Sequence, residues 1–141
     1  MTLAPTATAA WEGAGDVRWR CEVVARAASS KLGHGTVVLD VERLLGLTDA
    51  FVVTSGSNPR QVRTISEEVE RQLKLAGAGR PLSVEGLDDA RWVLMDYGDF
   101  VVHVFLDEAR EFYDLEGLWG DATLWAWDEE VGALTLASPR A

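Results

Sequence analysis

Two aspartates and one loop of this sequence could supply the chemistry of a phosphate-transferring enzyme. Asp40 and Asp96 each close a run of apolar and β-branched residues, and two strand carboxylates held together could bind the magnesium of a nucleotidyl transfer. The small residues Ser55, Gly56 and Ser57 lead into a predicted helix N-terminus, where free amides could hold a phosphate. A metal-dependent nucleotidyl transferase is therefore one hypothesis.

The spacing of these residues argues against that enzyme. No Asp-x-Asp pair occurs on any predicted strand, and neither the P-loop motif nor the dinucleotide-binding glycine motif is present. An acid at a strand end most often stabilises a turn, and a small-residue loop before a helix most often caps that helix. We predict no catalytic residues and keep the transferase as the alternative.

One histidine also has the chemistry of a general base. His103 falls on the same face of a predicted hairpin as Asp96, which could orient it, but no cysteine or serine nucleophile is placed beside them. A hydrogen-bonded histidine within a sheet is the favoured interpretation. The single cysteine, Cys21, cannot form an internal disulfide, and two histidines without a second thiol cannot make an ordinary closed zinc site. We expect no cofactor, no metal and a reducing, cytoplasmic setting.

Binding is better supported than chemistry. Trp92, Arg110 and Tyr113 are residue types that dominate interface hot spots, and Gly117, on the same helical stripe as Arg110 and Tyr113, would let another chain approach closely. The alternative is that Trp92 is covered by the protein's own helix and Tyr113 merely lies over a strand. The residues alone leave the two open.

The element that positions Trp92 is a hairpin at 92–106 with a turn at Gly98 and Asp99. A register that pairs Tyr97 with Phe100 predicts that one face of the hairpin belongs to the core. The other face combines large rings with an acid and an imidazole, and we expect another element or a partner to cover it. The core face is Val93, Met95, Tyr97, Phe100, Val102, Val104 and Leu106, and the second face is Trp92, Leu94, Asp96, Val101, His103 and Phe105.

Helices are predicted before, between and after the strands by apolar residues spaced three or four apart. The first begins at Asp16 and stops at Gly33, the second is capped by Asn58 with Pro59 and Gln61 behind it, and the third begins at Asp107. Their inward faces are Val17, Cys21, Val24, Ala28 and Leu32; then Val62, Ile65, Val69, Leu73 and Ala76; then Ala109, Phe112, Leu115 and Trp119.

Short β-branched runs predict the remaining strands. Residues 36–40 and 51–54 should be central, 81–85 should lie near an edge because it starts with proline, and Trp125 and Trp127 suggest a docking hairpin in the tail. The order predicts a single α/β domain, a mixed sheet flanked by helices. We divide the chain into a flexible lead-in (1–15), the domain (16–122) and a C-terminal extension (123–141).

Charge limits the partners. The 141 residues carry a net charge of −10, which disfavours binding to DNA or RNA phosphates and suits a basic protein. No apolar run approaches the roughly 20 residues that cross a bilayer, and no signal sequence opens the chain.

Four segments together resemble the ribosomal silencing factors, the RsfS or Iojap family. They are TDAFVVTSGSNPRQV (48–62), VEG (84–86), WVLMDYGDFVVHVF (92–105) and REFYDLEGLWGDA (110–122), in the family's order. The resemblance covers most of 17–122 and does not extend to the lead-in or the tail. It implies a nucleotidyltransferase-like fold without catalytic acids, in agreement with the missing Asp-x-Asp pair.

The resemblance also implies a function and a mechanism. Family members bind the large ribosomal subunit through ribosomal protein L-fourteen, where the small subunit docks, and so repress translation when nutrients fail. They form dimers off the ribosome, which makes a homodimer an expectation here. A homodimeric interaction module without ribosome binding is a further alternative.

Carried over by position, the family's partner contacts fall on Trp92, Tyr113, Leu115, Glu116 and Trp119. Helical phase instead assigns Leu115 and Trp119 to the core, so the two arguments disagree for that pair. With Arg110 and Gly117 added from the residue pattern, seven residues form the predicted partner-binding set.

Overall fold

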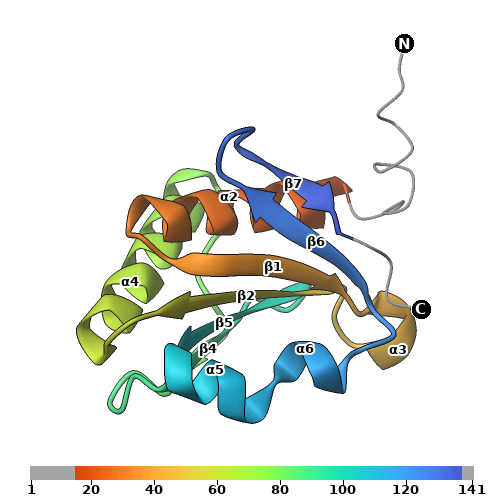
Figure 1. Cartoon of the computed structure of the whole chain (residues 1–141). Helices are drawn as coiled ribbons and strands as arrows, with labels where there is room; N and C mark the ends of the chain where they lie inside the picture. Colours follow the sequence, from red (N-terminus) through yellow and green to blue (C-terminus); the bar gives the residue numbers. More distant parts are fainter. Residues whose placement is uncertain (1–14, 138–141) are drawn as a thin grey trace.

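The computed structural model describes residues 15–137, arranged as one mixed sheet with helices on both faces (Figure 1). The expected lead-in, apart from Gly15, lies outside the described residues. In chain order the elements are α2 (Gly15–Ser30), β1 (His34–Asp40), α3 (Glu42–Leu45), β2 (Ala50–Gly56), α4 (Pro59–Leu75), β3 (Ser83–Glu85), β4 (Trp92–Asp96), β5 (Phe100–Leu106), α5 (Asp107–Tyr113), α6 (Leu115–Leu118), β6 (Thr123–Asp128) and β7 (Ala133–Leu136).

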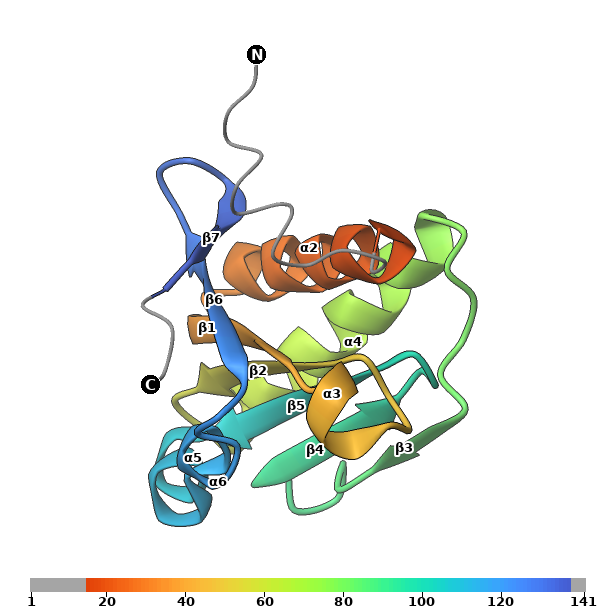
Figure 2. The same cartoon turned by 90° about the vertical axis from the view of Figure 1, so that its right-hand side faces the viewer.

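The seven strands are ordered β3-β4-β5-β2-β1-β6-β7. β2 and β5 are parallel, and every other neighbouring pair is antiparallel. α2 and α4 cover one face, while α5 and α6 lie on the other, which is plainest when the molecule is turned by 90° (Figure 2). The α/β class, the central place of the first two strands and the edge position of β3 are as predicted.

The hairpin of β4 and β5 has the predicted register. The backbone N–H of Tyr97 donates to the carbonyl of Phe100 over 3.0 Å, and Trp92 pairs with Phe105. Val93, Met95, Val102 and Val104 are buried beneath α4's side of the sheet. Phe105 and His103, on the second face, are buried as well, because α5 and α6 cover the face that the sequence left uncovered.

The first helix ends at Ser30, two residues before the last residue of its predicted apolar face. Cys21, Val24 and Ala28 are buried, but Leu32 is 77% exposed, so its assignment to the inward face was wrong. Leu32 has a left-handed backbone (φ +66°), and the next N–H, that of Gly33, returns to the carbonyl of Ala28 over 2.8 Å. This 6→1 hydrogen bond closes the helix end and turns Leu32 away from the core.

The start of α4 is fixed by the predicted cap. The backbone N–H of Gln61 donates to Asn58 Oδ1 over 2.9 Å, and Gln61 Oε1 accepts from the backbone N–H of Ser57 over 2.6 Å. Two otherwise unpaired amides are satisfied in this way. The loop before α4 therefore caps its own helix, the favoured interpretation of its sequence.

The third helix is interrupted, contrary to prediction. Asp114 has φ +46° and ends α5, and its carboxylate accepts from the N–H of Gly117 (3.1 Å) to start α6. Residues after Asp114 therefore do not continue the helical phase of α5. Leu115 is buried as predicted, whereas Phe112 is 78% exposed, and its assignment to the core was wrong.

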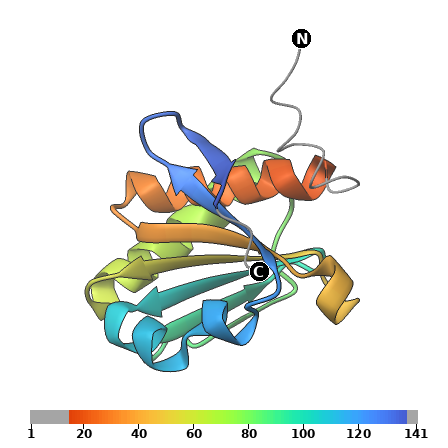
Figure 3. The ribbon, with the colours of Figure 1, turned by 45° about the vertical axis from the view of Figure 1, so that its right-hand side comes forward.

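The predicted tail hairpin docks on the domain. β6 pairs with β1 and with β7, and the hairpin runs beside α2 (Figure 3). Trp125 is fully buried with the guanidinium of Arg18 5.2 Å from its ring centre, and Arg26 lies 5.5 Å from the ring centre of Trp127. These cation–π contacts join the hairpin to α2.

Candidate functional site

A cluster of rings reaches the surface where β4 begins and α5 ends. Trp92 stacks on its cross-strand partner Phe105 with ring centres 4.8 Å apart, and the ring centre of Tyr113 lies 4.8 Å from that of Trp92 and 6.5 Å from that of Phe105. Phe112 meets Tyr113 edge to face at 5.0 Å. Trp92 is half-buried and Tyr113 is 48% exposed, so part of the cluster faces solvent. We call Trp92, Phe112 and Tyr113 the aromatic surface.

His103 supports this surface from below. The indole N–H of Trp92 donates to Nδ1 of His103 over 3.0 Å, and the Phe51 ring meets the imidazole edge to face at 4.8 Å. Burial lowers the pKa of His103 to about 4, so the ring is neutral at neutral pH. Because Nδ1 accepts, the proton of the neutral ring is on Nε2, which is buried and unpaired among the described residues.

The suggested pairing of His103 with Asp96 does not form. Asp96 instead accepts the N–H of Gly98 over 2.8 Å and so stabilises the hairpin turn. Asp40 likewise accepts the N–H of Glu42, at 3.3 Å. Both acids therefore stabilise turns, as their positions at strand ends predicted. The two strands that carry them, β1 and β4, are separated in the sheet by β2 and β5.

Arg110 faces inward and holds α5 in place. Its Nε and Nη2 donate to one carboxylate oxygen of Glu116, at 3.2 and 2.7 Å, while Nη1 donates to Ser55 Oγ at 2.9 Å. His34 adds a second connection, with Nε2 2.7 Å from an Asp107 carboxylate oxygen. These bonds join α5 to α6 and to the ends of β1 and β2.

α6 is positioned by its first turn. A Cβ at position 117 would lie 2.7 Å from the Asp114 Cγ, so a side chain there would push the capping carboxylate aside. Leu115 is buried, and Trp119 packs against the core with its ring 5.8 Å from that of Phe51. The glycine is thus explained by the cap, before any partner is considered.

The structure brings the seven predicted residues into one region in different roles. Trp92 and Tyr113 touch and are partly exposed, Arg110 and Glu116 pair with each other, and Leu115 and Trp119 pack inward beside Gly117. Two exposed apolar residues also lie here: Phe112, which was predicted to face inward, and Leu118, which was not singled out from the sequence. The spacing of Asp114 and Gly117, typical of a helix cap, was the signal that could have revealed them.

The segment that carries Tyr113 is acidic. Residues 107–121 contain six acids and one base, and that base, Arg110, is paired with one of the acids. The acids are Asp107, Glu108, Glu111, Asp114, Glu116 and Asp121. An apolar surface with acidic neighbours fits a partner that presents basic residues around an apolar patch.

Within 15–137 no three His, Cys, Asp or Glu side chains are grouped closely enough to hold a metal ion. None of the helices in that range has the length and apolar character needed to cross a bilayer.

Comparisons with known proteins agree on one family. The family model described as ribosomal silencing factor during starvation matches residues 15–139. The ribosomal silencing factor RsfS of Bacillus subtilis is 40% identical over 103 residues, which are 73% of this chain and 86% of that protein. The chloroplastic protein Iojap of Zea mays is 35% identical over 106 residues, 71% of this chain and 43% of that one.

Solved structures show the same relationship. A crystal structure of a Chromobacterium violaceum protein aligns with a TM-score of 0.69 at 36% identity, covering 72% of this chain and 83% of that one. A Bacillus halodurans protein aligns with a TM-score of 0.61 at 34% identity, covering 69% and 90%. The fold and the sequence thus lead to the same set of relatives.

Proposed function

This chain belongs to the family of ribosomal silencing factors, and we propose that it binds the large ribosomal subunit through ribosomal protein L-fourteen and blocks the small subunit from joining. The binding site is the aromatic surface together with α6. Translation is repressed when nutrients are limiting. The proposal assigns the effect to occlusion, with no reaction, no cofactor and no metal.

The observation that carries the proposal is the contact of Trp92 and Tyr113. Two large rings lie 4.8 Å apart at the edge of the core, supported by His103 and Phe105, and Phe112 extends them into solvent. Rigid aromatic side chains lose little conformational entropy on binding and bury a large apolar area. A surface prepared in this way suits a stable protein–protein contact.

Charge supports the kind of partner. A ribosomal protein that binds rRNA is expected to be basic, and the acidic segment 107–121 would attract it over distances of about a Debye length, ~8 Å at physiological salt. The same charge repels rRNA phosphates. The acidic segment therefore favours contact with the protein and disfavours direct contact with RNA.

The enzyme alternative receives no support from the geometry. Asp40 and Asp96 are in turns on strands that are not neighbours, and the loop before α4 uses its amides to cap its helix. We propose that the fold is used here only as a scaffold for binding.

A homodimer off the ribosome is also part of the proposal, as is a cytoplasmic location. The second face of the hairpin is covered by the chain's own α5 and α6, and we propose that the dimer uses the exposed rings of the aromatic surface instead. Dimer formation and subunit binding would then compete for Tyr113 and Phe112.

Binding to purified L-fourteen and to intact large subunits, each at increasing salt, tests the proposal. We expect binding to both, weaker as salt rises, because opposite charges attract less at high ionic strength. Binding to the large subunit without any binding to L-fourteen would contradict the proposed partner. Absence of binding to either would contradict the function.

A further inference from the structure

A hollow of about 270 Å³ lies between α4 and the edge of the sheet formed by β3 and β4. Val84 of β3 and Met95 of β4, which are cross-strand partners, line it together with Leu87 of the loop after β3. Trp92 lies on the other face of β4, because side chains alternate along a strand. The hollow is therefore separate from the aromatic surface.

The floor of the hollow is apolar, and the chain covers it only in part. Met95 is buried, Val84 is partly exposed and Leu87 is 41% exposed. Arg63 of α4 donates through Nε to the carbonyl of Leu87 at 3.0 Å and through Nη2 to the carbonyl of Asp88 at 2.7 Å. These two bonds hold the loop against α4, so the hollow has a fixed wall.

The rim of the hollow is acidic. Glu67 and Glu70 of α4 and Asp88 of the loop line it, and all three are exposed. No described residue forms a hydrogen bond or an ion pair with their carboxylates. The one base of the lining is Arg63, so three carboxylates against one guanidinium leave a net charge of −2.

The bases next along α4 leave this charge in place. Arg71 pairs with Glu68 instead, with Nη2 2.8 Å from a carboxylate oxygen. Lys74, one helical turn after Glu70, forms no ion pair with it among the described residues. Charges beside apolar surface attract each other more strongly than charges in open water. The hollow therefore suits a cationic group on an apolar stem.

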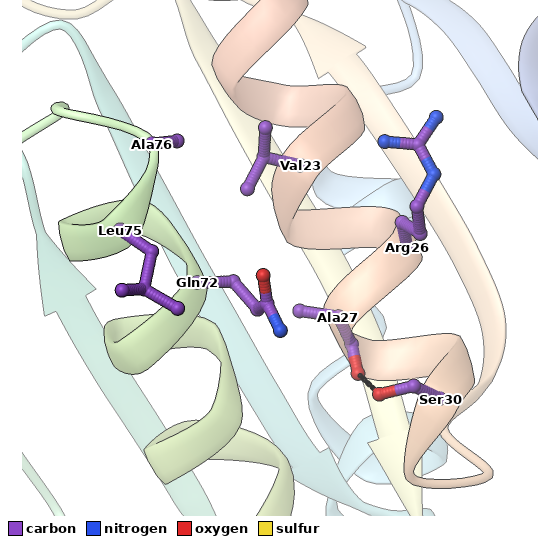
Figure 4. A pocket seen from close by; sticks show the side chains of 7 residues that line it. All are labelled: Val23, Arg26, Ala27, Ser30, Gln72, Leu75 and Ala76. Atoms are coloured by element: carbon purple, nitrogen blue, oxygen red, sulfur yellow. Dashed lines mark hydrogen bonds between the residues drawn. The ribbon is translucent and has the colours of Figure 1, made fainter.

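The hollow between α2 and α4 does not have this character (Figure 4). Arg26 is the charged residue of its lining, and its guanidinium is already engaged within the chain. It donates to the carbonyl of Gly132 and lies 5.5 Å from the ring centre of Trp127. The hollow beside β3, by contrast, combines an apolar floor with carboxylates that the described chain leaves unpaired.

β3 leaves room for an extended segment beside the hollow. Among the described residues it is the last strand on its side of the sheet and pairs with β4 alone. Leu82, directly before β3, is 75% exposed. A strand added to this edge would place one side chain opposite Val84, in the same row as Val84 and Met95 and therefore at the hollow. Peptides bind in this way to other sheet edges, where pockets for alternate side chains give specificity.

We propose that the hollow between α4 and β3 binds a lysine or arginine side chain of an extended basic segment of a partner protein. The segment lies along β3, and the apolar stem of the bound side chain covers Val84 and Leu87. Its charged head lies among the carboxylates of Glu67, Glu70 and Asp88. A nucleic acid does not fit, because the same carboxylates repel phosphates. The inference does not depend on the proposed function, since the aromatic surface is on the other face of the sheet.

Two labelled peptides test the proposal with the full chain. In one of about ten residues, lysine alternates with threonine, and in its twin glutamine replaces every lysine. Fluorescence anisotropy gives the affinity of each. We expect the lysine peptide to bind and the twin to bind at least tenfold more weakly. The Glu67→Gln and Glu70→Gln double variant should weaken the lysine peptide at least tenfold, and Leu87→Ser should weaken it as well.

The matched control is the Glu108→Gln and Glu111→Gln double variant. It removes the same charge from exposed positions of α5, on the other face of the sheet, and should bind the lysine peptide as the parent does. Equal weakening by the two double variants would show a general attraction to acidic surface and overturn the proposal. No binding of the lysine peptide, or equal binding of the glutamine twin, would overturn it too. Thermal unfolding verifies that the variants fold, as exposed positions should allow.

Discussion

The indole N–H of Trp92 donates to Nδ1 of His103 over 3.0 Å, directly beneath the proposed binding surface. The bond requires the neutral imidazole, and burial among Phe51, Phe105 and Trp92 provides it by lowering the His103 pKa to about 4. A residue that resembles a catalytic base therefore fixes the orientation of Trp92, a proposed contact residue.

The stability of the domain should depend on pH through His103. Its pKa is about 4 when folded and near 6.5 when unfolded, so the unfolded chain binds more protons between these values. Stability should fall as pH drops from 6.5 to 4, by roughly 3 kcal/mol, and be fully present above 6.5. Urea unfolding at pH 4 and pH 7 measures this difference. The His103→Asn substitution, which keeps an acceptor for Trp92, should reduce this difference in stability between pH 4 and pH 7. If the difference is unchanged in that variant, groups other than His103 cause it.

Removal of the Tyr113 ring should weaken subunit binding and leave the fold intact. Tyr113→Ala takes away half-exposed apolar area at the centre of the aromatic surface, at a cost of about 2 kcal/mol in binding free energy if Tyr113 is a hot spot. Co-sedimentation with large subunits gives the affinity. Tyr113→Phe is the matched control, because it keeps the ring and should bind nearly as well as the parent. Parental affinity in the alanine variant would exclude Tyr113 from the site.

Arg110 should act through the position of α5. Arg110→Ala removes bonds to Glu116 and Ser55, which we expect to cost about 1–3 kcal/mol of stability and to increase amide hydrogen exchange across 107–119. The Glu116→Gln variant keeps an acceptor for Arg110. Its amide hydrogens across 107–119 should therefore exchange less than those of the Arg110→Ala variant. If Arg110→Ala lost subunit binding with exchange unchanged, a direct contact would be indicated.

Gly117 should be intolerant of a side chain because of Asp114. Gly117→Ala places a Cβ against the capping carboxylate, with an expected loss of about 1–2 kcal/mol. The same substitution in an Asp114→Gly background, where no carboxylate is present and positive φ is easy, should cost much less. A double-mutant cycle from chemical denaturation measures this coupling. Additive effects would mean that Gly117 is required for another reason.

Local patterns predicted much of this fold. The hairpin register and the α4 cap follow from residues close in sequence, and both are observed as predicted. The break at Asp114 was missed because the three-and-four spacing continues through it, while the left-handed backbone that ends α5 depends on a single aspartate. Leu32 was misassigned for the same reason, since a left-handed residue closes that helix too.

The residues of the candidate site could be predicted from the sequence, but the contacts that some of them make could not. Trp92 and Tyr113 were chosen as exposed contact types, and the structure brings them together. The inward role of Arg110 could not be predicted, because its partners Ser55 and His34 are 55 and 76 positions away in the sequence. Only tertiary packing brings these groups within hydrogen-bonding distance.

We propose that this protein and the small subunit compete for one surface of the large subunit. Light scattering of purified subunits measures their joining directly, with the protein added either before or after they are mixed. Protein added first should slow joining strongly, and protein added last should have little effect. The Tyr113→Ala variant, when added first, should slow joining less than the parent does. If the subunits join at the normal rate while the protein remains bound to the large subunit, the protein does not act by occlusion.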